Sequence, residues 1–227
     1  MIVSIHQPYY FPWLGYFEKI LKADVFVILD DVQYEKNNFY NRNKIKTSNG
    51  TTWITVPVQY RSKINLMDIE IDNKRNWQKK HFDSIYFSYK KAPYFKEHEE
   101  FLHNIYKEKT WDKLIDLNLY TLNYLIDSMD IKTPIKYATQ LGISTTATQR
   151  LIDITQAVNA NTYLSGSSGK KYMELDLFDK ANIDVIYQDY TSPQYKQLGD
   201  TFEPNMCILD LILNHHDKAK EIILSAK

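Results

Sequence analysis

Hydrophobic and polar positions follow two periods along the chain. Short apolar or β-branched runs predict strands at residues 2–5, 25–29, 53–58, 64–71, 134–137, 161–164 and 184–187. The run at 25–29 is apolar throughout, which is typical of a strand buried on both faces, whereas 64–71 alternates like a half-exposed strand. The pair Asn49-Gly50 indicates a tight turn that joins residues 44–47 and 53–58 as a hairpin.

Helical periodicity fills the intervals between these runs. It predicts helices at residues 13–21, 77–89, 95–106, 111–129, 148–159, 170–181, 207–214 and 218–225. Strands and helices alternate at both ends of the chain. This order predicts an α/β fold: a mostly parallel sheet flanked by helices, with a helical insertion at about residues 75–130 and a small antiparallel appendage. The length of 227 residues predicts a single domain over 1–227.

Composition and charge narrow the classes of function. The 28 basic and 28 acidic side chains cancel, so charge alone implies no DNA partner. The single cysteine, Cys207, excludes an internal disulfide framework and a zinc site of several thiolates, and we expect a small buried residue there rather than a nucleophile. No apolar run approaches 18 residues and the N-terminus lacks signal-peptide character, so we expect a cytoplasmic protein without a membrane span.

The first candidate site follows the first predicted strand, because ligands of parallel α/β sheets bind beyond the carboxyl ends of strands. His6 ends that strand, and Gln7 precedes a turn stiffened by two prolines and rich in aromatic residues. We interpret His6 as a candidate catalytic base, and Gln7, Tyr9 and Trp13 as substrate contacts. The alternative is a structural histidine at the edge of the sheet.

The second candidate site follows the buried strand at 25–29. Asp30 and Asp31 are candidate catalytic carboxylates that would orient His6 or the substrate, and neighbouring side chains point opposite ways, so we expect one of them to face the site. Arg42, Asn43 and Lys44 are candidate substrate contacts, with the two cations suited to phosphate. We expect no metal, because no His or Glu shares the segment. The alternative is a charged surface loop.

The third candidate site is a Gly/Ser loop between a predicted strand and a predicted helix. Its substrate-binding candidates are Ser165, Gly166, Ser167, Ser168, Gly169, Lys170 and Tyr172. A strand, a small-residue loop and a helix opened by lysine form the layout that binds anions at a helix N-terminus. Only two residues separate the glycines, so it is not a nucleoside-triphosphatase loop. The alternative is a helix cap. Residues 187–195 add aromatic and amide groups that could line the same pocket.

These segments together carry a resemblance that covers nearly the whole chain. The chain resembles the WbqC-like family of bacterial proteins. The matching pieces are residues 5–9, 12–13, 15–17, 23–27, 30–33, 41–43, 57–58, 163–166, 169, 172, 202, 204–205 and 210–211. Tyr9 stands where the family tends to have Asn, and Cys207 stands where it tends to have a small hydroxyl residue. The second departure weakens any mechanism through Cys207.

The resemblance implies a role in bacterial surface-polysaccharide synthesis. Members of this family occur in gene clusters for O-antigen and other surface polysaccharides, and glycine transfer onto an amino sugar has been proposed for some. The implied function is a transferase of lipopolysaccharide O-antigen biosynthesis that acylates, in one version glycylates, a nucleotide-linked amino sugar. Its partners would be that nucleotide sugar and an activated acyl donor, with tRNA left open as a donor and no cofactor identified.

Two alternatives accompany this reading. One is a non-catalytic sugar-nucleotide-binding or assembly protein. The other is a nucleotidyltransferase, which is not supported because Tyr16 follows Gly15 where the H-x-G-H device needs its second His. The resemblance supplies no catalytic residues, so the site assignments rest on the residue types alone.

Overall fold

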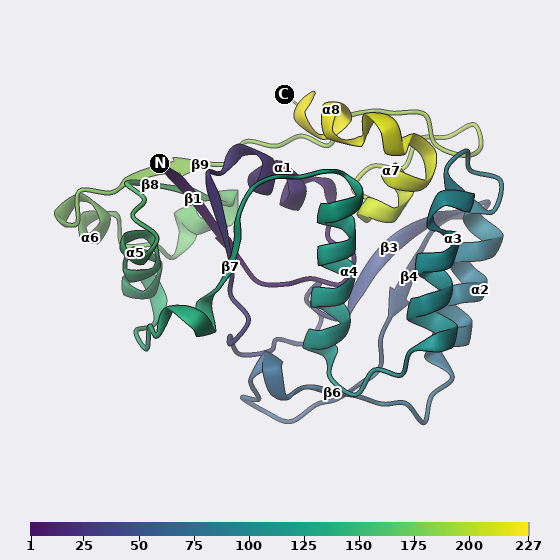
Figure 1. Cartoon of the computed structure of the whole chain (residues 1–227), viewed down its shortest axis with the longest axis horizontal. Helices are drawn as coiled ribbons and strands as arrows, with labels where there is room; N and C mark the ends of the chain where they lie inside the picture. The colour runs from purple at the N-terminus through teal and green to yellow at the C-terminus, as the bar shows by residue number, and fades with distance from the viewer. Residues whose placement is uncertain (227) are drawn as a thin grey trace.

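A five-stranded parallel sheet forms the centre of the computed structural model, which describes residues 1–226. Its order is β7-β2-β1-β8-β9 (Figure 1). The strands are β1 (Ile2–His6), β2 (Val25–Ile28), β7 (Ile135–Tyr137), β8 (Thr162–Ser165) and β9 (Asp184–Tyr187). The predicted α/β fold with a parallel sheet is confirmed. Every one of these strands was predicted to within two residues.

The register brings the predicted loops to one edge of the sheet. His6 pairs with Ile28 across β1 and β2, and Ser165 pairs with Tyr187 across β8 and β9. Because the strands are parallel, the segments that follow β1, β2, β8 and β9 all leave the sheet at its carboxyl edge. This edge therefore collects three of the sequence segments that were singled out for chemistry.

The alternation of side chains divides the core between the two faces of the sheet. Val3, Ile5 and Val27 pack with α5 (Ala147–Ala157) and with Phe178 of α6 (Leu175–Lys180). Phe26 and Ile28 point to the other face and pack with α1 (Leu14–Lys22), α4 (Leu114–Ser128) and α7 (Ile208–His215). The even-numbered position of His6 places its side chain on the α1 face.

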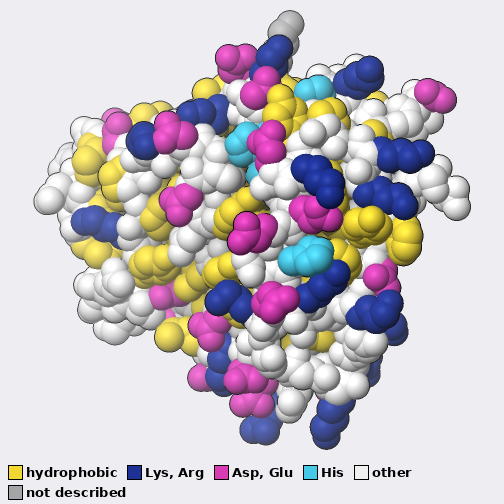
Figure 2. Space-filling view, turned by 45° about the vertical axis from the view of Figure 1, so that its right-hand side comes forward, with side chains coloured by type: hydrophobic (Ala, Val, Ile, Leu, Met, Phe, Trp, Pro, Cys, Tyr) yellow, Lys and Arg dark blue, Asp and Glu magenta, His cyan; other side chains and the backbone are white. Residues whose placement is uncertain are grey.

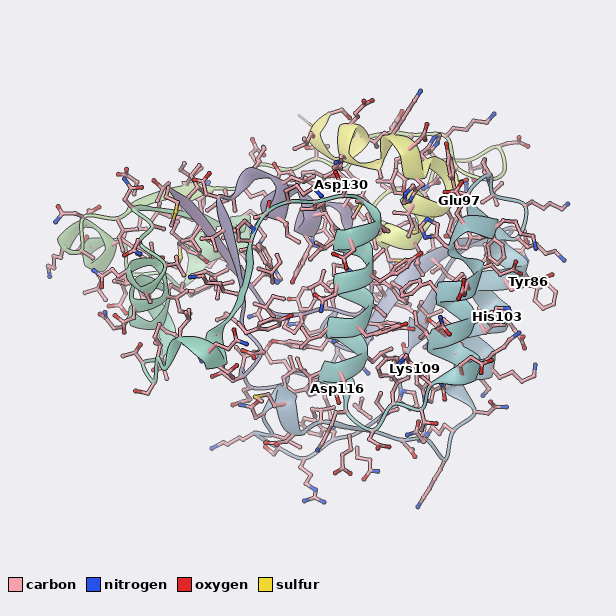
Figure 3. The ribbon with its side chains drawn as sticks, in the orientation of Figure 1. Tyr86, Glu97, His103, Lys109, Asp116 and Asp130 are labelled. Atoms are coloured by element: carbon pink, nitrogen blue, oxygen red, sulfur yellow. The ribbon has the colours of Figure 1, made fainter. Side chains whose placement is uncertain are left out.

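Helices of the predicted insertion enlarge the core on the α1 face. They are α2 (Trp77–Tyr89), α3 (Phe95–His103), a π-helical extension η2 (Asn104–Glu108) and α4. Figure 1 shows α4 between the sheet and the α2–α3 pair, and Figure 3 labels Asp116 and Asp130 near its two ends. The chain closes with α7, a 3-10 turn η5 (His216–Lys218) and α8 (Ala219–Leu224).

The antiparallel appendage is confirmed, with different bounds. Strands β3 (Arg42–Thr47) and β4 (Gly50–Thr55) form the predicted hairpin, but β4 starts directly at the turn and ends before Pro57, which lacks the N–H that a ladder needs. The predicted strand at 64–71 is wrong over most of its length. Asn65 Oδ1 accepts the Met67 N–H at 2.9 Å and caps a 3-10 turn, η1 (Leu66–Asp68). Only β6 (Glu70–Ile71) remains a strand, paired with β5 (Val58–Gln59).

The predicted helix at 170–181 is two separate elements. A 3-10 turn, η4 (Ser167–Lys171), is followed by α6. Between them the Glu174 N–H donates to Thr148 Oγ1 at 3.2 Å, so it is not available to a continuous helix. A further 3-10 turn, η3 (Ala138–Leu141), joins β7 to α5.

Two features of the described residues bear on their surroundings: the charge on one face and the character of the helices. On the face shown in Figure 2, basic and acidic side chains are interspersed, in keeping with a net charge of zero. Within residues 1–226, no helix combines the length and the apolar character that crossing a membrane requires.

Candidate functional site

The loop after β1 is held in place by two buried asparagines. Asn43 Nδ2 donates to the Phe11 carbonyl at 2.7 Å, and Asn118 Nδ2 donates to the carbonyls of Tyr40 at 2.8 Å and Pro8 at 3.2 Å. Phe11 itself takes a left-handed conformation with φ of 44°. Asn43, which was predicted to contact substrate, is 1 % exposed and supports the loop from behind.

A cavity of about 500 Å³, here called the His6 cavity, opens beside this loop on the α1 face of the sheet. It draws residues from the ends of β1, β8 and β9, from α1 and from three loops. Its lining is His6, Tyr9, Trp13, Lys19, Asn38, Phe39, Gly166, Ser167, Ser168, Gln188 and Asn205. No carboxylate is among these residues, and Lys19 is their only formal charge.

His6 has one ring nitrogen engaged and one free. Its ring lies edge-on to Tyr9 and to Tyr16, with centroids 4.8 Å apart in each pair. Nδ1 lies 3.0 Å from the Gln7 carbonyl, which only an N–H can satisfy, so the tautomer leaves the Nε2 lone pair available. Nε2 has no hydrogen-bond partner within residues 1–226. Burial, with the charge of Lys19, lowers the pKa of His6 well below its usual 6.5, so the imidazole is neutral at pH 7.

Lys19 is the site residue that the sequence analysis missed. It is 2 % exposed on α1, and burial lowers the pKa of its ammonium group to about 7. No hydrogen bond or ion pair to Nζ is found among residues 1–226. The signal was present in the sequence: Glu18 and Lys19 interrupt an otherwise apolar helix, and a charge pair within such a run is rarely accidental.

Glu18, the neighbour of Lys19, is committed elsewhere. Its carboxylate pairs with Lys22 and accepts a hydrogen bond from Gln188 Nε2 at 2.5 Å. The same Nε2 also donates to the Gly15 carbonyl at 2.7 Å. Glu18 therefore fixes the amide of Gln188 at the cavity wall, and its charge raises the pKa of Lys19 less than burial lowers it, without an ion pair between the two side chains.

Gly15 lets Trp13 fold over the start of α1. A Cβ at Gly15 would lie 2.3 Å from the Trp13 ring. The other side of the indole meets Tyr190, with ring centroids 5.4 Å apart. The close approach of backbone and indole places Trp13, a predicted substrate contact, on the wall of the His6 cavity.

The two aspartates lie away from His6. The Asp30 carboxylate accepts hydrogen bonds from Thr139, at 2.6 Å from Oγ1 and 3.1 Å from N, and so caps η3. Asp31 pairs with Arg150 at 2.5 Å. Asp31 lines a cavity, but that cavity is a second one and not the His6 cavity.

This second space, the Arg150 cavity, has a volume of about 400 Å³. Three predicted site residues line it: Gln7, Asp31 and Tyr172. The start of α5 completes it, with Thr146, Ala147 and Arg150, together with Leu29, Val32, Gln33 and Leu151. Gln7 directly follows His6, so each cavity takes one lining residue from the end of β1.

The Gly/Ser loop contributes its middle part to the His6 cavity. Gly166, Ser167 and Ser168 line it. The buried Ser165 hydroxyl donates to the Gly166 carbonyl at 3.1 Å. A Cβ on Gly169 would lie 2.1 Å from that hydroxyl oxygen, so this glycine is required for packing.

The three predicted cations do not line the His6 cavity. Lys170 is exposed, with Nζ 4.9 Å from the centroid of the Tyr187 ring. Arg42 and Lys44 both lie over Trp53, at 4.6 and 5.2 Å from the ring centroid. The structure thus brings together the histidine and the small-residue loop of the prediction, but it supplies the charge from Lys19.

Other candidate chemistry is weak. Residues 1–226 contain no group of three or more His, Cys, Asp or Glu side chains that could hold a metal ion. Burial raises the pKa of the Cys207 thiol to about 12, so it is protonated at neutral pH and a poor nucleophile.

Comparison with known proteins places nearly the whole chain in one family. Residues 7–222 match the model of the WbqC-like protein family. The chain is also similar to a protein of Mycobacterium tuberculosis named as uncharacterized protein Rv1507c, with 38% identity over 215 residues that cover 93% of each chain. No solved structure matches the chain significantly.

Proposed function

We propose, on the premise that this chain belongs to the WbqC-like protein family, that it is an acyltransferase of bacterial surface-polysaccharide synthesis. The acceptor is the amine of a nucleotide-linked amino sugar, and the acyl group is glycyl in the version we favour. One observation carries the proposal: a neutral His6 presents an unengaged Nε2 in a cavity of about 500 Å³.

The lining of the His6 cavity suits a sugar nucleotide. Tyr9, Trp13 and Phe39 offer aromatic faces for a base or a sugar ring. The amides and hydroxyls of Asn38, Asn205, Ser167, Ser168 and Gln188 offer hydrogen bonds for sugar hydroxyls. A mostly apolar wall with a few placed polar groups is the usual composition of a small-molecule site.

His6 would act as the general base of the transfer. The sugar amine attacks the carbonyl carbon of an acyl ester or thioester, and the new C–N bond forms. Nε2 takes the proton that the attacking nitrogen loses. The tetrahedral intermediate then collapses, the bond from carbon to the donor oxygen or sulfur breaks, and the proton passes from Nε2 to that leaving group. A histidine with a lowered pKa is ready for the first step at neutral pH.

The Arg150 cavity gives the second substrate a place. A transfer between two substrates needs two binding spaces, and Gln7, which lines the Arg150 cavity, directly follows His6 along the chain. We therefore assign the activated acyl donor to the Arg150 cavity. Asp30 takes no part in this proposal, because its carboxylate is engaged by Thr139.

Product formation tests the transferase. The purified protein is incubated with UDP- and dTDP-linked amino sugars and a panel of glycyl donors, namely a thioester, a carrier-bound glycine and glycyl-tRNA. Mass spectrometry should detect the N-glycylated nucleotide sugar with one of these donors. If no N-acylated product forms with any of them, the transferase proposal is wrong.

A binding or assembly protein without turnover is the second candidate. It is favoured by one observation: among residues 1–226, no carboxylate forms a hydrogen bond or ion pair with His6 that would orient it or stabilise its protonated form. Calorimetric titration with the same nucleotide sugars separates the two. Tight binding without product in every donor mixture would support the second candidate.

A further inference from the structure

The His6 cavity has an unbalanced charge. Lys19 is the only charged residue in its lining, and no carboxylate lines it. The nearest acidic side chain along the chain, Glu18, is engaged by Lys22 and Gln188. Lys19 is 2 % exposed and no hydrogen bond or ion pair to its Nζ is found among residues 1–226, so its protonated form costs free energy unless an anion neutralises it.

We propose that Lys19 holds an oxyanion of the ligand, a phosphate or a carboxylate, at the inner wall of the His6 cavity. The inference deepens the proposed function, since it rests on the same cavity and names the group that the ligand must carry there. It also replaces Lys170, Arg42 and Lys44, the cations that the sequence pointed to.

The neighbours of Lys19 suit an anion. Ser167 and Ser168 bring hydroxyl donors from the loop after β8 to the same cavity. Asn38 and Asn205 bring side-chain amides that can donate as well. A cation and several neutral donors, with no competing carboxylate, form the set that recognises phosphate or carboxylate oxygens.

An anion beside Lys19 would also serve the chemistry at His6. Lys19 is close enough for its charge to lower the pKa of the His6 imidazole. When an oxyanion neutralises Lys19, that repulsion falls and the protonated form of His6 becomes easier to reach. The anion of the ligand would therefore raise the pKa of His6, the base that acts on that ligand. A ligand without the anion would bind more weakly and react more slowly.

Matched pairs of probes test the inference by isothermal titration calorimetry. Uridine diphosphate against uridine reports on a phosphate, and glucuronate against glucose reports on a carboxylate. The variant is Lys19→Met, whose unbranched side chain is one atom shorter and carries no charge. The control is Lys170→Met, which removes an exposed lysine beside the same loop. We expect Lys19→Met to weaken one charged probe about tenfold or more, with its neutral partner unchanged.

The remaining measurements separate the outcomes. Thermal unfolding of Lys19→Met should show a Tm at or above that of the wild type, since a buried amine without a hydrogen-bond partner is removed. Three results would each overturn the inference. The charged probes could bind Lys19→Met and the wild type equally well, or only Lys170→Met could lose affinity. The third such result is that neither charged probe binds the wild type. Binding through Lys19 without any acylated product would retain it and remove the transferase. Product formation together with unaltered binding in Lys19→Met would retain the transferase and remove the inference about Lys19.

Discussion

Two histidines in this molecule have similar surroundings but differ in how many of their ring nitrogens form hydrogen bonds. His6 and His81 both lie among tyrosines, and burial lowers the pKa of both. His81 uses both ring nitrogens: Nε2 donates to the Thr55 carbonyl at 3.1 Å, and Nδ1 accepts from Tyr10 Oη at 3.1 Å. Tyr106 Oη in turn bonds to Tyr10. His6 uses Nδ1 alone.

The tyrosines around them differ in the same way. The hydroxyls of Tyr10 and Tyr106 bond to each other in the His81 network. Beside His6, the buried Tyr16 hydroxyl has no partner among residues 1–226, and the same is true of Tyr190 Oη next to Trp13. Burial and a lowered pKa therefore do not locate a site. Polar atoms that lie beside a cavity without a hydrogen-bond partner are the better indication of a binding site.

The largest expected difference between the two regions is in rate. His6→Gln should lower the rate of acyl transfer by about 10²–10⁴-fold, since the general base is lost, with little change in ligand affinity. His81→Gln should leave the rate within about threefold, because its ring is committed to structure. Single-turnover product formation measures both. Equal losses in the two variants would break the comparison.

Acid stability should depend on His81. The pKa of this histidine is about 4 in the folded protein and 6.5 when it is unfolded, so the unfolded chain binds the proton more readily. The contribution of neutral His81 to the free energy of unfolding is complete above about pH 6.5. It is lost as the pH falls toward 4, and the loss amounts to at most about 3 kcal/mol.

Urea unfolding measured from pH 7 to 4 checks this expectation. The free energy of unfolding should fall less steeply in His81→Gln than in the wild type over that range. A slope that the substitution leaves unaltered would show that His81 is not a source of acid sensitivity.

Removal of a tyrosine hydroxyl should distinguish the satisfied region from the unsatisfied one. Tyr106→Phe deletes a buried hydroxyl that bonds to Tyr10, and should cost about 1–2 kcal/mol in the free energy of unfolding. Tyr16→Phe deletes a hydroxyl without a partner and should cost nothing or stabilise the protein. Chemical denaturation compares the two. A larger loss in Tyr16→Phe would contradict the assignment.

The smallest effect on folding is expected at Gly15. In Gly15→Ala the new Cβ would displace the Trp13 ring, which now lies 2.3 Å from that position. Alanine gains about 1 kcal/mol in helix propensity over glycine, which offsets the lost packing, so the Tm should move little. Ligand affinity should fall because Trp13 leaves the cavity wall. Titration beside Trp13→Phe, a variant that keeps an aromatic ring there, provides the control.

The sequence by itself determined the sheet and the edge at which to look. Local periodicity places β1, β2, β8 and β9, and parallel strands must release their following loops on the same side, so His6 and the segment 166–168 meet without further information. The loop after β1, which Pro8 and Pro12 mark in the sequence, contributes Tyr9 and Trp13 to the lining of the His6 cavity. Periodicity failed to give the length of two elements. The predicted strand around Asn65 is replaced by a 3-10 turn that the Asn65 side chain caps, and the predicted helix from Lys170 is interrupted where the Glu174 N–H bonds to another element.

Only the tertiary structure decided which charge enters the site. Lys19 faces the cavity because α1 packs its buried face on the sheet beneath the loops after β8 and β9, more than 140 residues away along the chain. Lys170, adjacent to the glycines, turns to Tyr187 instead. The partners of Asp30 and Asp31 likewise come from Thr139 and Arg150. Residue type states what a side chain can bind, but its neighbours in the fold determine whether that capacity is already used.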